Sequence, residues 1–272
     1  MILAYFSCKE ICVYRLILSS VLATFISFGL SGCKEDEKLV VATAAEFPPF
    51  EFKEGSEYKG VDMDISKEIA KRLGKELEIK DMEFDSVMSA VSSGNADFAA
   101  SGLTINETRL KVADFTKPYY NANQVVVIKS ENAELKAVKN NAEALIDAIS
   151  KKNGIKIGVQ TSTTGAFFAK GDKDWGFVGF PNAEVKSFVN GSLAISALVN
   201  GQVDLVILDE APAKLISKAN AGTEVLPITL TQEQYGVAVK KGNKELLDSI
   251  NGALEAMEKD GTLESIMQKY FK

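Results

Sequence analysis

The sequence predicts an α/β protein with two similar lobes, each built on a mainly parallel sheet with helices on both faces. Strand-like and helix-like segments alternate after residue 38, which is typical of parallel strands joined by helices. The alternation stops over residues 118–129 and starts again at residue 155, which indicates two lobes. No low-complexity linker separates the two series, so we expect strand-like segments to cross between the lobes.

The first series contains three strands and two helices. A buried strand is expected at Leu39–Thr43, where the residues are mainly apolar or β-branched. Asp62 is expected to cap a helix that ends at Gly74, because apolar residues recur between them at every fourth position. The other elements are a strand at 76–80, a helix at 85–93 before Gly94, and a strand at 97–101.

The second series repeats this pattern after a long extended run at Gln124–Lys129. We expect strands at 155–159, near Val185, at 203–208 and at 235–240. Helices are expected from about Thr164, at 193–200, 212–219, 245–259 and 263–270. Leu247, Ile250, Leu254 and Met257 form the apolar stripe of the longest one.

The composition excludes several classes of function. The net charge of −6 and the absence of a Lys/Arg cluster argue against a nucleic-acid partner. The chain has no histidine, which removes histidine-based triads and imidazole metal ligands. All three cysteines lie in the first 33 residues, so the rest of the chain has no disulfide or thiolate site. We expect neither a cofactor nor a bound metal.

The N-terminal segment resembles a lipoprotein signal peptide. Leu16–Leu30 is too short for a typical membrane span but fits the apolar core of a signal peptide. Small residues before Cys33 resemble a lipobox, so we expect cleavage after residue 32 and a lipid on Cys33, with residues 33–38 as a tether. The alternative is an uncleaved anchor helix. The segment before the apolar core is unusually long and carries Cys8 and Cys12, so translation can start further in.

Residues 101–109 contain a candidate anion site. Thr104 or Asn106 can cap a helix that places Arg109 on its first turn and continues into the apolar-periodic segment Leu110–Phe115. Free amides at a helix start, a hydroxyl and a guanidinium together can bind a carboxylate. The alternative is a surface arginine on an ordinary capped helix.

Three further segments can complete a ligand site. Thr163 or Thr164 caps a helix after the strand at 155–159, which offers a second anion cradle or an ordinary capped helix. Asp209 follows a buried strand, where it can receive an ammonium group or cap the helix that Pro212 helps to start. Phe47 and Phe84 can flank a ligand or simply pack in the core. No nucleophile–base pair accompanies these groups, so binding is favoured over catalysis.

The chain resembles the polar amino acid-binding proteins of bacterial ABC importers over its whole length after the signal peptide. The matching segments are Glu46–Glu51, Gly60–Asp64, Ser101–Thr104 with Arg109, Asp114–Tyr119, Gly158–Gln160 with Thr163 and Thr164, and Tyr235–Gly236. The resemblance implies two Rossmann-like lobes joined by two hinge strands, the type II periplasmic binding protein fold, closing over one amino acid. Lobe 1 would be 39–119 with 235–272, lobe 2 would be 125–230, and the hinge 120–124 with 231–234.

The resemblance also implies roles for single residues. Arg109 and Thr104, with the Gly102 amide and help from Thr164, would hold the α-carboxylate. Asp209 and the Gly102 carbonyl would hold the α-ammonium group. Phe47 and Phe84 would flank the side chain. The expected ligand-binding set is Phe47, Phe84, Ser101, Gly102, Thr104, Arg109, Gln160, Thr163, Thr164 and Asp209.

Departures from the family pattern bear on specificity. Ala44 stands where glutamine- and histidine-binding members have an aspartate, and Gln160 and Leu208 stand where glutamine binders have lysine and histidine. The pattern at Gln160 and Gln124 favours the arginine/lysine-binding branch, with Glu46 as a candidate for the missing negative charge. A neutral amino acid such as glutamine, cysteine or cystine fits as well.

The resulting hypothesis is a monomeric, lipid-anchored receptor in the cell envelope that delivers an amino acid to an ABC permease. One alternative is a periplasmic dehydratase of prephenate or arogenate on the same fold, although Asp209 argues against a substrate without an ammonium group. Another alternative is a ligand-sensing or adhesive surface lipoprotein.

Overall fold

The computed structural model describes residues 38–138 and 140–271, and residues 38–272 form one compact unit. The predicted signal peptide, Cys33 and all of the tether except Lys38 lie outside the described residues. Within the described part of the chain, no helix has the length and apolarity to cross a membrane.

The first sheet combines the N-terminal strands with one strand from near the C-terminus. Its order is β5 (Leu77–Asp81), β1 (Leu39–Thr43), β6 (Phe98–Ala99), β15 (Ala238–Lys240) and β7 (Ala113–Phe115). β1 runs parallel to β5 and β6, whereas β15 is antiparallel to β6 and β7. The hairpin strands β2 (Glu46–Phe47), β3 (Glu51–Glu54) and β4 (Glu57–Lys59) form a small separate sheet.

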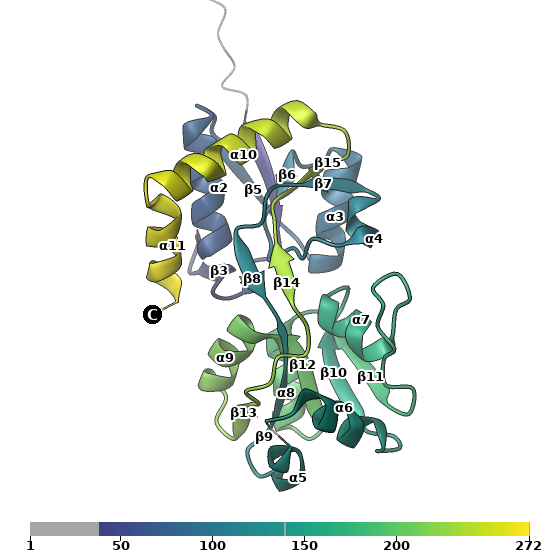
Figure 1. The fold of residues 1–272 in the computed structure, drawn as a ribbon. Coiled ribbons are helices and arrows are strands. Elements are labelled where there is room, and N and C mark those ends of the chain that lie inside the picture. The colour runs from purple at the N-terminus through teal and green to yellow at the C-terminus, as the bar shows by residue number, and fades with distance from the viewer. Residues whose placement is uncertain (1–37, 139, 272) are drawn as a thin grey trace, which may run out of the picture. The chain divides into compact units, whose positions relative to one another are not determined.

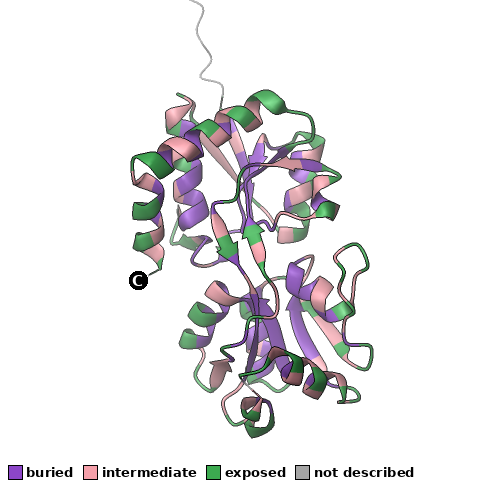
Figure 2. Cartoon of the chain, in the orientation of Figure 1, coloured by how far each residue is buried: buried purple, intermediate pink, exposed green. Residues whose placement is uncertain are grey.

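Helices cover both faces of the first sheet (Figure 1) because the side chains of its strands alternate between two apolar clusters. Val41, Phe98 and Val239 pack with residues of α2 (Val61–Arg72), α10 (Lys244–Lys259) and α11 (Thr262–Tyr270). Ala42 and Ala99 pack on the other face with residues of α3 (Phe84–Ser93). The burial colours of Figure 2 show the same pattern, with buried strands and helices exposed on their outer sides.

The second sheet repeats this arrangement. Its order is β11 (Glu184–Phe188), β10 (Lys156–Gln160), β12 (Leu205–Asp209), β9 (Gln124–Lys129) and β13 (Thr223–Val225). β10 is parallel to β11 and β12, and β9 is antiparallel to β12 and β13. The helices of this lobe are α5 (Ala133–Ala137), α6 (Ala142–Ser150), α7 (Thr164–Lys170), α8 (Gly191–Val199) and α9 (Glu210–Ala219). The predicted α/β class with two sheet-containing lobes is confirmed.

Two paired segments connect the sheets. β8 (Tyr120–Ala122) pairs antiparallel with β14 (Glu233–Tyr235), and Figure 1 shows both running between the two lobes. β8 leads into β9 of the second sheet, and β14 leads into β15 of the first sheet. Each mainly parallel sheet therefore receives its antiparallel strand from one of these two crossings.

Three local predictions were wrong. Asp62 is not a helix cap: α2 begins at Val61 after Gly60, and the Asp62 side chain turns inward to bond the Gly102 amide. The segment after Arg109 does not continue as a helix, because α4 (Glu107–Leu110) lasts one turn and residues 113–115 pair with β15 as β7. The strand predicted at 235–240 is interrupted, since Gly236 bonds Leu103 and Val237 bonds Thr116 instead of continuing one ladder.

Candidate ligand-binding site

A small buried cavity lies between the two lobes. Nine residues line it: Phe47, Phe84, Gly102, Thr104, Arg109, Gln160, Thr163, Thr164 and Asp209. They end or follow β1, β5, β6, β10 and β12, at the sheet edges where open α/β sheets bind ligands. Their side chains nearly fill the cavity and leave about 10 Å³, roughly the room for one water molecule. A larger ligand therefore needs the lobes to separate or the side chains to shift.

Arg109 is held by a short local structure. The Asn106 side chain caps α4 by accepting a hydrogen bond of 2.9 Å from the Arg109 amide. The sequence predicts free amides at this helix start that can bind an anion. The Arg109 amide is instead bonded to Asn106, and α4 has only four residues. The attraction for an anion therefore comes from the guanidinium rather than from a helix start.

The Arg109 guanidinium is buried and makes no hydrogen bond to a carboxylate of the described residues. It donates to the backbone carbonyls of Thr104 (2.9 Å) and Ser162 (3.2 Å). Its faces are covered by the rings of Phe84 and Trp175, whose centroids lie 5.6 and 5.7 Å from the guanidinium carbon. Burial lowers the pKa of Arg109 to about 10, against the raising effect of the charges of Glu233 and Asp209. The group stays charged at pH 7.

The second lobe contributes hydroxyl groups through the turn after β10. Thr163 caps α7 by accepting a bond from the Ala166 amide, and its own hydroxyl donates to the Gln160 carbonyl. Thr164 faces Thr104 of the first lobe, with 3.1 Å between the two hydroxyl oxygens. Ser162, directly before Thr163, has a φ of 61°, a left-handed conformation that non-glycine residues adopt rarely. This turn carries the Ser162 carbonyl to Arg109.

Asp209 ends β12 inside the cavity, and its side chain makes no cap bond to α9. Its carboxylate accepts a hydrogen bond from the Tyr235 hydroxyl. Burial raises the pKa of Asp209 to about 7, and the nearby charge of Glu233 adds to this effect, while the bonds from Tyr235 and Gln124 oppose it. No cation of the described residues pairs with Asp209.

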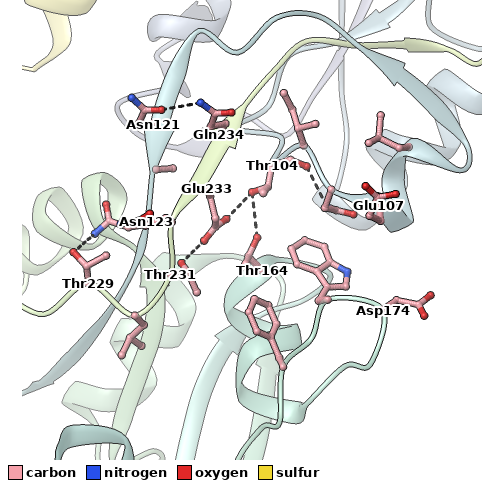
Figure 3. A pocket seen from close by; sticks show the side chains of 18 residues that line it. Thr104, Glu107, Asn121, Asn123, Thr164, Asp174, Thr229, Thr231, Glu233 and Gln234 are labelled. Carbon is pink, nitrogen blue, oxygen red and sulfur yellow. Dashed lines mark hydrogen bonds between the residues drawn. The ribbon is translucent and has the colours of Figure 1, made fainter. Parts of the chain in front are cut away.

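Glu233 is a site residue that the motifs did not indicate. Figure 3 shows its carboxylate on β14 between Thr104 and Thr231, both of which donate to it, at 2.7 and 2.6 Å. The Gln124 side chain donates to the same group at 3.1 Å. Glu233 lines a larger neighbouring cavity of about 940 Å³ that shares Thr104 and Thr164 with the buried one. Its place two residues before Tyr235 is the one signal that could have found it.

Ser101 is the one predicted site residue that does not line the cavity. Its hydroxyl donates to the buried carboxylate of Glu51 at 2.9 Å and accepts a bond from the Ala44 amide. The Gly102 amide, which is predicted to help hold the α-carboxylate, donates in this structure to Asp62 at 2.7 Å. The Gly102 carbonyl remains as the group of this residue that can meet a ligand.

Of the positions that bear on specificity, Gln160 lines the cavity, whereas Ala44, Leu208 and Glu46 lie outside it. Ala44 and Leu208 are buried in the apolar clusters of their lobes. Glu46 is exposed and accepts a bond from the Asn190 side chain. The negative charge expected from Glu46 therefore does not enter the cavity, whereas that of Glu233 lies beside it.

The chain matches known proteins over most of its length. The model of the family described as bacterial extracellular solute-binding proteins, family 3, matches residues 39–272. A probable histidine-binding protein of Neisseria gonorrhoeae is 33% identical and covers 85% of this chain and 82% of its own. An ancestral arginine-binding protein, solved with arginine, is 40% identical with a TM-score of 0.75, covering 86% of this chain and 98% of its own. An ancestral amino acid-binding protein, described as a precursor of cyclohexadienyl dehydratase, is 33% identical with a TM-score of 0.74, covering 86% and 95%. The predicted type II fold is confirmed by these neighbours.

Proposed function

Because this chain belongs to the bacterial extracellular solute-binding proteins of family 3, we propose that it captures an L-amino acid for an ABC importer. One observation carries the proposal: a buried guanidinium and a buried carboxylate, neither paired with an opposite charge of the described residues, line the same cavity. Unpaired buried charges are costly, and a zwitterion offers a partner for each. The names of the relatives support an amino acid as that zwitterion.

Each lining group has a proposed role. Arg109 and the Thr104 hydroxyl hold the α-carboxylate with help from Thr164, while Thr163 caps the helix that carries Thr164. Asp209 and the Gly102 carbonyl hold the α-ammonium group. The last three lining residues, Phe47, Phe84 and Gln160, form the walls around the amino acid side chain. Hydrogen bonds to ionised groups are stronger than neutral ones, so the two charged residues dominate affinity.

We propose that lobe 1 comprises residues 39–119 and 235–272 and that lobe 2 comprises 125–230. Residues 120–124 and 231–234 then act as the hinge, and the pairing of β8 with β14 supports this division. The cavity is too full for an amino acid, so binding begins from a form in which the lobes are further apart. Closure over the ligand joins the carboxylate-binding groups of both lobes.

We propose that the ligand is a polar amino acid, with arginine or lysine weakly favoured. Arginine- and histidine-binding relatives support this choice, and Glu233 adds a negative charge beside the cavity. Glutamine, cysteine and cystine are the competing ligands. A dehydratase acting on prephenate or arogenate is the second candidate function, favoured by the structural neighbour that preceded such an enzyme.

We further propose that Cys33 is lipidated and anchors the protein to a membrane, facing the periplasm or the cell exterior. The small residues before Cys33 support this assignment. Labelling with radioactive palmitate in cells tests it: the wild type should incorporate label and Cys33→Ala should not. Label on the Cys33→Ala protein would contradict the assignment.

A thermal-shift screen against the twenty amino acids, ornithine and cystine tests the binding function. A true ligand stabilises the protein by RT ln(1 + [L]/Kd), about 2.7 kcal/mol at a hundred times Kd. Arg109→Ala should cost about 2–5 kcal/mol of affinity in calorimetry, because the carboxylate loses its buried partner. Arg72→Ala, which removes an arginine paired with Glu68 and Asp260 away from the cavity, is the matched control.

A screen with no stabilising amino acid would overturn the receptor function. Wild-type affinity in Arg109→Ala would overturn only the role assigned to Arg109. Turnover of prephenate or arogenate by the purified protein would favour the dehydratase.

A further inference from the structure

Residues 171–179 of the second lobe form a tightly built loop. The backbones of Asp172 and Phe177 exchange hydrogen bonds of 2.9 and 2.8 Å, and the Asp172 side chain accepts a bond from the Trp175 amide. Gly171 and Gly179 close the base with positive φ, and a Cβ at Gly179 would lie 2.4 Å from the Gly171 nitrogen. The loop therefore presents residues 174 and 175 in a defined place.

This loop contacts the first lobe at two points. The Trp175 ring lies over the Arg109 guanidinium, on which Phe84 of the first lobe also lies. Asp174 forms an ion pair of 2.9 Å with Lys111, two residues after Arg109. Both contacts join one lobe to the other, so they form when the lobes come together and are lost when they separate.

The Trp175 ring is placed by stacking rather than by a hydrogen bond. Phe167 stacks on it at a centroid distance of 5.0 Å and an interplanar angle of 24°. Its indole N–H is buried and has no hydrogen-bond partner among the described residues. Since an unmet buried donor is unfavourable, the packing against Phe167 and Arg109 must outweigh that cost.

We propose that Trp175 is the positioning residue that completes the carboxylate site when the lobes close. This inference rests on the proposed role of Arg109. The face of an aromatic ring attracts a guanidinium but accepts none of the guanidinium N–H bonds. A carboxylate in the position of Trp175 would instead compete with the ligand carboxylate for those donors. By covering the cation, the ring also excludes water and strengthens the bonds that Arg109 makes to a bound carboxylate.

Because the ring reaches Arg109 only in the closed form, its loss should act on ligand dissociation rather than on capture. Trp175→Ala should therefore release ligand about ten-fold faster, with the association rate within about two-fold of the wild type. Trp175→Phe keeps an aromatic face and removes the unpartnered indole N–H, so it should restore most of the slow release. Val178→Ala, a change at an exposed side chain of the same loop, should leave both rates unchanged.

The experiment is stopped-flow binding with the amino acid that gives the largest shift in the thermal screen. Trp175 is the only tryptophan of the chain, so its own emission reports closure in the wild type, and Val178→Ala retains that signal. Rates for the Trp175 variants come from displacement of isotope-labelled ligand. Circular dichroism and the unfolding temperature of each ligand-free variant confirm that it folds.

Emission that changes on ligand addition, with faster release in Trp175→Ala and rescue in Trp175→Phe, would support the proposal. Release from Trp175→Ala within two-fold of the wild type would overturn it, as would a Trp175→Phe variant as impaired as Trp175→Ala. In those two cases wild-type binding survives, so the receptor function stands. If no amino acid binds the wild type, the receptor function itself fails and this proposal falls with it.

Discussion

Replacing Asp62 with asparagine tests whether the acid behind the cavity holds a proton in the folded protein. Asp62 is fully buried on α2, where it accepts hydrogen bonds from the Gly102 amide at 2.7 Å and from the Tyr119 hydroxyl at 2.8 and 2.9 Å. Burial raises its pKa from 3.8 to about 7, although these two bonds oppose the shift. The buried carboxyl of Glu51, whose pKa is also raised by burial and by the charge of Asp62, lies beside it.

The size and sign of the effect follow from this pKa. A carboxyl whose folded pKa exceeds its unfolded value adds stability that is complete below pH 3.8 and is lost as the pH rises through about 7. The separation of about 3 pH units corresponds to about 4 kcal/mol in the free energy of unfolding. Asp62→Asn cannot ionise, so its stability relative to the wild type should rise by about this amount between pH 4 and pH 8.

Urea unfolding of both proteins across that pH range measures the difference. Asp64→Asn is the matched control on the same helix, because bonds from Lys269 and Tyr270 lower the pKa of Asp64 despite its partial burial. Because its pKa is lowered from 3.8, the stability that Asp64 adds is already complete above about pH 5, so the stability of Asp64→Asn relative to the wild type should stay nearly constant from pH 5 to pH 8. A constant offset between wild type and Asp62→Asn from pH 4 to pH 8 would refute the reasoning.

Further perturbations at Asp209, Gly60 and Gly252 have defined outcomes. Asp209, with a pKa of about 7, binds an ammonium group only when ionised, so amino acid affinity should fall about ten-fold per pH unit below 7. Calorimetry at pH 5.5 and 8 should show this pH dependence of affinity in the wild type but not in Asp209→Asn. If the dependence persists in Asp209→Asn, the titrating group is not Asp209. Gly60→Ala should cost about 3 kcal/mol or more in thermal unfolding, because its Cβ would lie 2.1 Å from the Phe50 carbonyl oxygen at a φ of 119°. Gly252→Ala, in open space on α10, should instead stabilise by about 0.5–1 kcal/mol, and destabilisation there would contradict the helix-propensity argument.

Much of the candidate site could be predicted from the sequence because its residues follow strands. Gly102 and Thr104 come after β6, Gln160 ends β10, and Asp209 ends β12. Strand patterns are local, and the parallel strands of each sheet bring their carboxyl ends to one edge, so local patterns predict which groups lie at the edge of each of the two sheets. The error at 110–115 has the opposite origin: the pairing of β7 with β15, more than a hundred residues away, outweighed a local periodicity.

The sequence by itself determined the α/β class and the charged groups offered to a ligand. Only the tertiary structure decided how those groups are supported. The Gly102 amide donates a hydrogen bond to Asp62, forty residues earlier, and the Ser101 hydroxyl donates one to Glu51, fifty residues earlier. Glu233 and Trp175 reach the site from a crossing strand and from a loop of the other lobe. Such contacts depend on the packing of distant segments, which no periodicity in the sequence records.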